Sequence, residues 1–179
     1  GQVTLCPGRE MSASDLADVD VLLVRSITQV NEALLMNTPV RFVGTATIGT
    51  DHIDLGYLRN NQIGFSSAPG CNADAVVEYV LSSIFLLAQQ QGFNPKERTY
   101  GIVGVGNVGR RLQQRLIQLG FKVLLNDPPR AEKESGFVDL NTLIAQADVL
   151  CLHTPLTEDG AHPTRYLFGA ERLQRLREG

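Results

Sequence analysis

The chain has 179 residues, of which 43% are hydrophobic and 20% are charged, an ordinary globular composition that can fill one large domain or two small ones. Sixteen Lys and Arg residues stand against 19 Asp and Glu residues, and the net charge of −3 argues against an overall attraction to nucleic acid or anionic lipid. The three cysteines are an odd number without tight spacing, which argues against a disulfide framework or a zinc site and favours a reducing, cytoplasmic setting.

Short apolar runs alternate with helical patterns along the chain, which predicts an α/β fold. In the first half we expect a helix over 31–36 and strands at 21–24, 40–43 and 63–66, with Gly44 stopping the second strand. The clearest helical period follows, with apolar residues three or four apart from Val76 to Ala88. Its wide apolar stripe predicts a helix packed on more than one side, but it is too short and too polar to span a bilayer.

A turn at Gly92-Phe93-Asn94-Pro95 ends this helix near Gln91, and we place the domain boundary there, giving domains 1–91 and 92–179. The pattern then starts again with predicted strands and helices in alternation. The strands are expected at 100–103, 122–126 and 149–152, and the helices over 108–119, around 140–144 and from about 167 to 176. Cys151 falls inside the last strand and is expected to be a reduced core residue.

The most informative motif is Gly104-Val105-Gly106-Asn107-Val108-Gly109, which follows one predicted strand directly and opens a helix. Gly104 allows a tight turn, Gly106 lets a pyrophosphate approach the backbone, and Gly109 lets helix and strand pack closely. The free N–H groups and the positive end of the helix then suit phosphate. The alternative is a glycine-rich turn that binds nothing.

Two strand ends extend this site. Asp127 ends the next strand, at the spacing expected for a carboxylate that accepts hydrogen bonds from both ribose hydroxyls, which favours NAD over NADP; the nearby Arg130 weakens that preference. Thr154 follows the strand 149–152 and offers a hydroxyl to the cofactor. The adjacent His153 is either a catalytic base or, more commonly at such a position, a structural residue.

Polar loops also follow two strands of the first half. Arg25-Ser26 comes after the strand 21–24, and the loop 44–52, which contains Thr47 and His52, comes after the next strand. Hydroxyls, backbone N–H groups and a cation at such positions suit an anionic small molecule. Ordinary turn chemistry of Ser, Thr and Asp is the alternative, for His52 beside Asp51 as well.

Taken together, these motifs resemble those of the D-2-hydroxyacid dehydrogenases over nearly the whole chain. The matching segments are Val24-Arg25-Ser26, Gly49 to Asp54, Asn72-Ala73 leading to Val77-Glu78, the glycine motif, and Ala147-Asp148-Val149 through Leu152 to Leu156. Other segments look specific to a branch of the family that acts on a phosphorylated 2-hydroxy acid: Phe42 to Thr47, Ala68 to Ala73, Gly101 to Arg111, and Asp127-Pro128-Pro129-Arg130.

The resemblance implies two doubly wound parallel-sheet domains, a flavodoxin-like substrate domain and a Rossmann NAD domain. Ser26 and Thr47 match substrate contacts, and Gly104, Gly106, Asn107, Val108, Gly109, Asp127 and Thr154 match cofactor contacts. The family's reaction moves a hydride between the substrate and NAD, with a carboxylate-binding Arg and a Glu–His pair. Those three residues would follow Gly179, so the resemblance places no catalytic residue in this chain.

The resemblance also implies a fragment of a longer homodimeric protein, with the first strand of one domain and the later strands of the other missing. We expect no metal, nucleic-acid or membrane partner. Two alternatives remain open: a dehydrogenase of another D-2-hydroxy acid such as 3-phosphoglycerate, and an NAD-sensing binding protein like the corepressors built on this fold.

Overall fold

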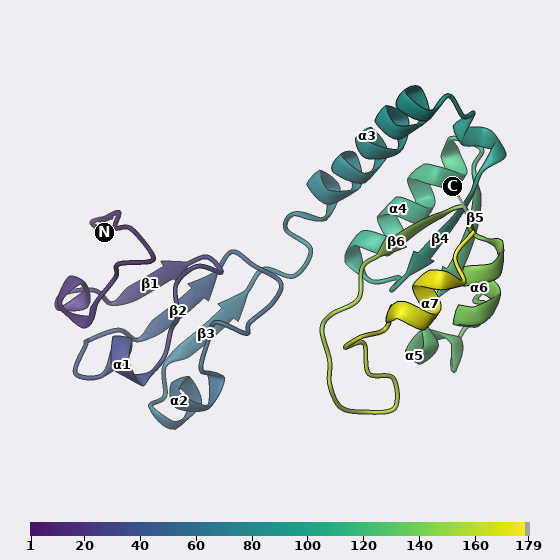
Figure 1. The fold of residues 1–179 in the computed structure, drawn as a ribbon. Helices are drawn as coiled ribbons and strands as arrows, with labels where there is room; N and C mark the ends of the chain where they lie inside the picture. The colour runs from purple at the N-terminus through teal and green to yellow at the C-terminus, as the bar shows by residue number, and fades with distance from the viewer. Residues whose placement is uncertain (178–179) are drawn as a thin grey trace. The chain divides into compact units, whose positions relative to one another are not determined.

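The computed structural model describes residues 1–177 and consists of two compact units, Gly1–Cys71 and the chain from Asn72 onward. Each unit contains a three-stranded parallel sheet with helices packed on it (Figure 1). The predicted α/β class with parallel sheets is therefore confirmed. Within the described residues, no helix is both long and apolar enough to cross a membrane.

The first unit has strands in the order β1 (Val21–Val24), β2 (Phe42–Thr45) and β3 (Gly64–Ser67). Its helices are short: α1 (Glu32–Leu35), α2 (Leu55–Asn60) and the 3₁₀ helix η1 (Ala13–Leu16). In β1, Leu22 and Val24 are buried in a core that includes residues of all three helices, whereas Val21 and Leu23 are 53% and 72% exposed. Alternation along the strand thus directs one face of this sheet to the helices.

Several details of the first unit differ from the prediction: β3 lies one residue later than expected, and η1 and α2 were not predicted. The second strand was expected at 40–43 with Gly44 as its stop, but β2 begins at Phe42 and pairs Gly44 with Leu23 of β1. A Cβ on Gly44 would lie 2.7 Å from Cδ2 of Leu23, so glycine makes room for a neighbouring side chain here rather than a turn. The unpredicted helix α2 begins where the Asp54 carboxylate accepts a hydrogen bond of 2.8 Å from the Tyr57 N–H.

The long helix α3 (Ala73–Gln91) ends at Gly92, whose positive φ of 71° suits a residue without a Cβ. The sequence assigned this helix to domain 1–91, whereas its contacts group it with the second unit, where it packs on α4; the functional boundary stays a prediction. The expectation of packing on several sides is wrong for the described residues, because Tyr79 and Leu86 are 74% and 54% exposed.

The second unit has its strands in the order β5 (Lys122–Asn126), β4 (Thr99–Val103) and β6 (Val149–Leu152), all parallel. The helices that follow α3 are η2 (Pro95–Glu97), α4 (Asn107–Gln118), α5 (Pro128–Ala131), α6 (Leu140–Gln146) and α7 (Ala170–Gln174). The predicted final helix is shorter than its leucine pattern suggested. The four-residue α5 was not predicted.

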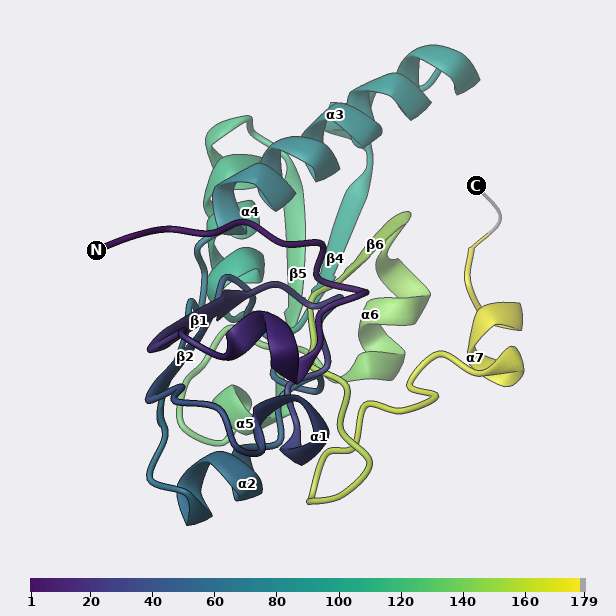
Figure 2. The ribbon, with the colours of Figure 1, turned by 90° about the vertical axis from the view of Figure 1, so that its left-hand side faces the viewer.

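Helices cover both faces of this second sheet (Figures 1 and 2), which is the doubly wound arrangement predicted for the NAD domain. Tyr100 and Ile102 of β4 pack in a core with residues of α3 and α4, whereas Val103 packs with residues of α6. The predicted core position of Cys151 is confirmed, and burial raises the pKa of its thiol to about 11. The thiol is therefore protonated at neutral pH.

Gly101 gives a test of this packing, because a Cβ there would lie 2.7 to 2.9 Å from atoms of Leu143, Leu150 and Ala147. We expect Gly101→Ala to lower the free energy of unfolding by roughly 2 kcal/mol through overpacking. Gly169→Ala is the control, since its Cβ would have no neighbour among residues 1–177 closer than 3.8 Å; because Gly169 is the N-cap of α7, where alanine is disfavoured, we expect a cost below about 1 kcal/mol. Equal urea midpoints for the wild type and Gly101→Ala would contradict the packing described.

Candidate cofactor and substrate sites

The register of the second sheet gathers one end of three strands. Val103 of β4 pairs with Asn126 of β5 and with Leu152 of β6, so Gly104, Asp127 and His153 leave the sheet at the same edge. Ligands of open parallel sheets bind at this carboxyl edge. The glycine motif and the two strand ends singled out from the sequence are thus brought together.

Each motif glycine occupies a different steric environment. Gly104 has a φ of +85°, and a Cβ there would lie 2.8 Å from the His153 carbonyl. A Cβ on Gly109 would lie 2.1 Å from the carbonyl oxygen of Gly104, which is shorter than any tolerable contact. Gly106, in contrast, has no heavy atom of another described residue within 4 Å of its Cβ position, its two chain neighbours aside. Two glycines are therefore required by the fold itself, while Gly106 leaves open space at the surface.

Helix α4 begins at this open position. Its N-cap is Gly106, and no side chain forms a capping hydrogen bond there. The N–H groups of the first turn, from Asn107, Val108 and Gly109, have no partner within the helix, as in any α-helix. An uncapped helix start beside an open glycine suits the diphosphate of a dinucleotide, so these residues fit NAD.

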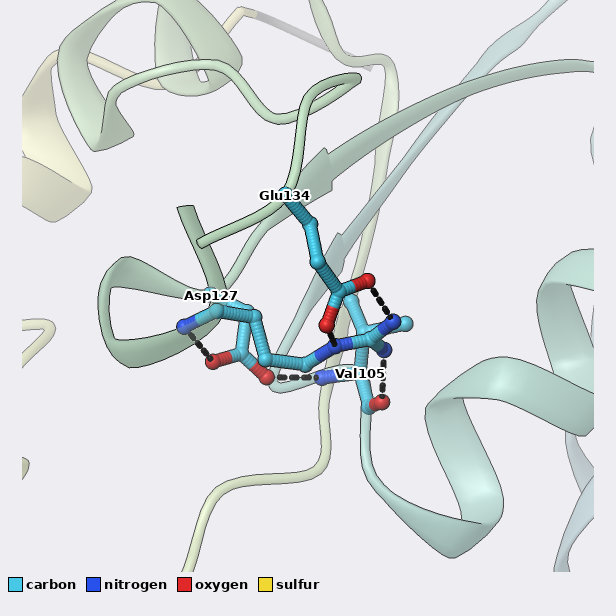
Figure 3. Close-up of polar contacts among 4 residues, drawn as sticks. Val105, Asp127 and Glu134 are labelled. Atoms are coloured by element: carbon cyan, nitrogen blue, oxygen red, sulfur yellow. Dashed lines mark hydrogen bonds and ion pairs between the residues drawn. The ribbon is translucent and has the colours of Figure 1, made fainter. Parts of the chain in front are cut away.

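Asp127 lies beside this loop and is the N-cap of α5. Its Oδ2 accepts a hydrogen bond of 2.8 Å from the N–H of Val105, and its Oδ1 accepts one of 3.3 Å from the N–H of Arg130 (Figure 3). A carboxylate offers about four acceptor positions, so both oxygens keep capacity for ribose hydroxyls. The bond to Val105 fixes the carboxylate against the glycine loop.

Arg130 is held on the same loop. One of its terminal nitrogens donates to the Val105 carbonyl at 2.6 Å, and the guanidinium pairs with both carboxylate oxygens of Glu134. The hydrogen bond with Glu134 raises the pKa of Arg130, and the same bond lowers the pKa of Glu134. The sequence had identified Arg130 as a cation near the ribose position but not the carboxylate that binds it.

A pocket of about 750 Å³ opens next to Asp127 and Thr154. Apolar residues from three segments line it, among them Pro128, Val138 and Leu167. Its volume and apolar lining are typical of a site for a flat organic group with a few polar contacts. No local sequence pattern marked Val138 or Leu167 as pocket residues, because they approach Asp127 only when the segments after β5 and β6 fold back.

His153 is next to Thr154 and is half-buried, and both its structural role and its acid–base role stay predictions. Its backbone N–H donates to the Val103 carbonyl at 2.8 Å, whereas the buried Nε2 of its ring has no hydrogen-bond partner among residues 1–177. Burial lowers the pKa of the imidazole. The folded protein therefore favours the neutral form of His153.

The first unit repeats the arrangement of strand ends with different side chains. Val24 pairs with Thr45, so Ser26 and Thr47 each follow paired residues by two positions at one edge of the sheet. The Ala46 N–H also donates to the Val24 carbonyl at 3.0 Å, which keeps the two loops adjacent. Ser26 is exposed and Thr47 is half-buried.

A chain of hydrogen bonds through Thr45 and His52 fixes the orientation of the Thr47 hydroxyl. The Thr47 hydroxyl donates to the Gly49 carbonyl at 2.8 Å and lies 2.7 Å from the Thr45 hydroxyl, which lies 3.0 Å from Nε2 of His52. Because Thr47 has only one proton, Thr45 must donate to it, and His52 must donate from Nε2 to Thr45. The sequence had left His52 as either a catalytic or a turn residue; the structure shows it as a buried donor that orients these hydroxyls. The Thr47 oxygen keeps one free acceptor position.

Comparison with known proteins agrees with this geometry. Residues 81–179 match the sequence profile described as "D-isomer specific 2-hydroxyacid dehydrogenase, NAD binding domain". The whole chain is 57% identical to the erythronate-4-phosphate dehydrogenase of Azotobacter vinelandii and 55% identical to that of Shigella dysenteriae. It spans 47% and 48% of those proteins, about half the length of the curated relatives it matches.

Solved structures of similar fold include NAD-bound enzymes. The 3-phosphoglycerate dehydrogenase of Entamoeba histolytica with NAD⁺ superposes with a TM-score of 0.77 at 26% identity, over 96% of this chain and 57% of the other. The D-lactate dehydrogenase of Aquifex aeolicus with NAD and lactic acid has a TM-score of 0.72 at 22% identity, over 95% and 57%. The second match concerns the fold alone.

The glycines give a prediction that separates binding from folding. Gly106→Ala adds a methyl group to open space, so we expect the free energy of unfolding to change by less than about 1 kcal/mol. The same methyl group blocks the approach of a diphosphate, and NADH affinity should fall at least about tenfold in a fluorescence titration. Gly109→Ala should instead cost roughly 3 kcal/mol of stability. Unchanged NADH affinity in Gly106→Ala would argue against a diphosphate at this loop.

His153 predicts a pH dependence of stability. Its pKa is lowered by folding, so the unfolded chain binds the proton more readily, and stability is present above the unfolded pKa of about 6.5 and is lost as pH falls through the folded value. We expect His153→Gln to lose less stability than the wild type between about pH 7.5 and pH 5. Parallel pH profiles of the two proteins in chemical denaturation would contradict this assignment.

Proposed function

The chain belongs to the D-isomer specific 2-hydroxyacid dehydrogenase family, and we propose that it serves the NAD-dependent oxidation of 4-phospho-D-erythronate to its 2-oxo acid, a step in pyridoxal 5′-phosphate (vitamin B6) biosynthesis. The observation that carries this proposal is the 57% identity to an erythronate-4-phosphate dehydrogenase over all of this chain. Because the chain spans about half of such proteins, activity and substrate are proposals for the gene product as a whole.

In this proposal, the edge of the second sheet holds the cofactor. Gly104, Gly106, Asn107, Val108 and Gly109 receive the diphosphate, Asp127 binds the ribose, and Thr154 contacts the cofactor from the end of β6. Support comes from the open Gly106, the uncapped start of α4 and the fixed carboxylate beside Val105. When bound, NAD supplies the hydride acceptor for oxidation at C2 of the substrate.

The loops of the first unit bind the substrate in this proposal. Ser26 offers a hydroxyl from an exposed loop, and Thr47 offers an acceptor position for a substrate hydroxyl while Thr45 and His52 fix its orientation. Domain 1–91 is accordingly the substrate domain and domain 92–179 the NAD domain. We assign no catalytic acid, base or carboxylate-binding residue to this chain, whose contribution is to bind and orient.

We propose further that the gene product is a cytoplasmic homodimer. It binds a small phosphorylated acid and not nucleic acid or membrane. Oxidation of 3-phosphoglycerate is the alternative that the Entamoeba histolytica fold match favours. The second alternative is an NAD-sensing binding protein that catalyses no reaction.

The proposal is tested on the complete product of the gene that encodes this chain. We expect NADH to form with 4-phosphoerythronate and not with 3-phosphoglycerate, in the presence of a 2-oxo acid that recycles tightly bound cofactor. Turnover of 3-phosphoglycerate and not of 4-phosphoerythronate would identify 3-phosphoglycerate as the substrate instead. No turnover with either acid, together with retained NADH binding, would favour the NAD-sensing protein.

Asp127→Asn tests the cofactor assignment. Asparagine is as good an N-cap as aspartate, so α5 should remain intact. The lost charge weakens the bonds to the ribose hydroxyls, and we expect NADH affinity to fall roughly tenfold. Thr99→Ser, remote from the carboxyl edge of β4, is the control and should bind NADH as the wild type does. Equal affinities in all three proteins would remove Asp127 from the site.

A further inference from the structure

The pairing of Arg130 is more extensive than a simple surface contact. Its guanidinium donates to the Val105 carbonyl at 2.6 Å and to the two oxygens of Glu134 at 3.0 and 2.5 Å. It also lies 5.2 Å from the centre of the Phe137 ring. Three of its five N–H donors are therefore occupied, and its orientation is set by three different residues.

The position of this cation matters because Asp127 is its neighbour. Val105 joins the two groups: its N–H donates to the Asp127 carboxylate and its carbonyl accepts from Arg130 (Figure 3). A 2′-phosphate on the adenosine ribose would therefore arrive at Asp127 with Arg130 as an adjacent cation. An arginine near this position is the usual means by which such folds accommodate the phosphate of NADP.

Here that arginine is already bound to a carboxylate. We propose that Glu134 is a positioning residue that sets the preference for NAD over NADP by binding and neutralising Arg130. This inference rests on the proposed NAD site. Asp127 disfavours the 2′-phosphate directly, whereas Glu134 acts at a distance from the ribose by keeping the adjacent Arg130 guanidinium from pairing with that phosphate.

Two other interactions offer alternative explanations for a preference against NADP. Glu134 could repel the phosphate directly, without Arg130. Arg110, on the first turn of α4, also acts on the Glu134 carboxylate, although its influence on that pKa is smaller than that of the Arg130 hydrogen bond. A test must therefore show that removing Glu134 acts through Arg130, and not through Arg110 or through the loss of the Glu134 charge itself.

The experiment measures NADH and NADPH dissociation constants of the complete gene product by fluorescence titration, with no need for turnover. We expect Glu134→Gln to tighten NADPH binding about 3-fold and Glu134→Ala roughly 10-fold, because the amide still accepts one bond from Arg130 whereas alanine accepts none. NADH affinity should change less than about twofold in both. Thermal unfolding of each variant verifies that the fold is intact; Glu134 is about half exposed, so little stability is at stake.

Two further proteins decide the mechanism. In an Arg130→Gln background, Glu134→Ala should leave NADPH affinity unchanged; a persistent gain would overturn the inference in favour of direct repulsion or of Arg110. Glu132→Gln removes an equal charge two residues away that contacts His162 and not Arg130; a gain equal to that of Glu134→Gln would likewise overturn it. If the wild type binds neither dinucleotide, the proposed cofactor site itself fails. NADH binding with no change in the NADPH-to-NADH ratio rejects the role of Glu134 alone.

Discussion

The parallel pairing of β4 with both of its neighbours is the constraint on which the second unit depends. Parallel strands end at a common edge, and the shared partner Val103 brings the residues after Asn126 and Leu152 to the end of β4. The glycine turn then has to reverse the chain into α4 without a side chain in the way. The 2.1 Å that would separate a Gly109 Cβ from the Gly104 carbonyl shows how little space this reversal leaves.

The hydrogen bonds at this edge form around a single residue of the turn. The Val105 N–H and carbonyl are bound by Asp127 and Arg130, whose side chains come from the start of α5. A backbone amide and carbonyl at a tight turn would otherwise need water as a partner. The two residues proposed to lie at the ribose thereby also stabilise the glycine loop proposed for the diphosphate, so a change in either one is expected to alter the loop geometry as well.

The first unit uses the same principle of strand ends with hydroxyls in place of glycines. Its loops are joined through the Val24 carbonyl, and the hydroxyl of Thr47 is oriented by Thr45 and the buried His52. A buried imidazole that donates one hydrogen bond is a stable way to fix the direction of a hydroxyl chain. Among residues 1–177, no side-chain hydrogen bond of this kind is formed by the exposed Ser26.

The sequence by itself determined the strands and the principal turns, because these depend on local pattern. β1, β5 and β6 have the predicted bounds, since continuous apolar runs between turn residues are typical of buried parallel strands. Gly92 and Gly104 could also be recognised, because each follows a strand or helix at a position where a positive φ is needed. The spacing from the Gly104 turn to Asp127 also predicts that the carboxyl edge of this sheet binds the cofactor.

Tertiary structure alone decided what depends on neighbours distant in sequence. The four-residue α5 and the six-residue α2 have too few residues for a periodic signal and are held by the capping side chains of Asp127 and Asp54. The exposed apolar face of α3 could not be told from a buried one, since the same leucines and aromatics serve both. Likewise, the pairing of Arg130 depends on a turn that brings both Glu134 and the Val105 carbonyl to its guanidinium. The composition of the chain does not predict that arrangement.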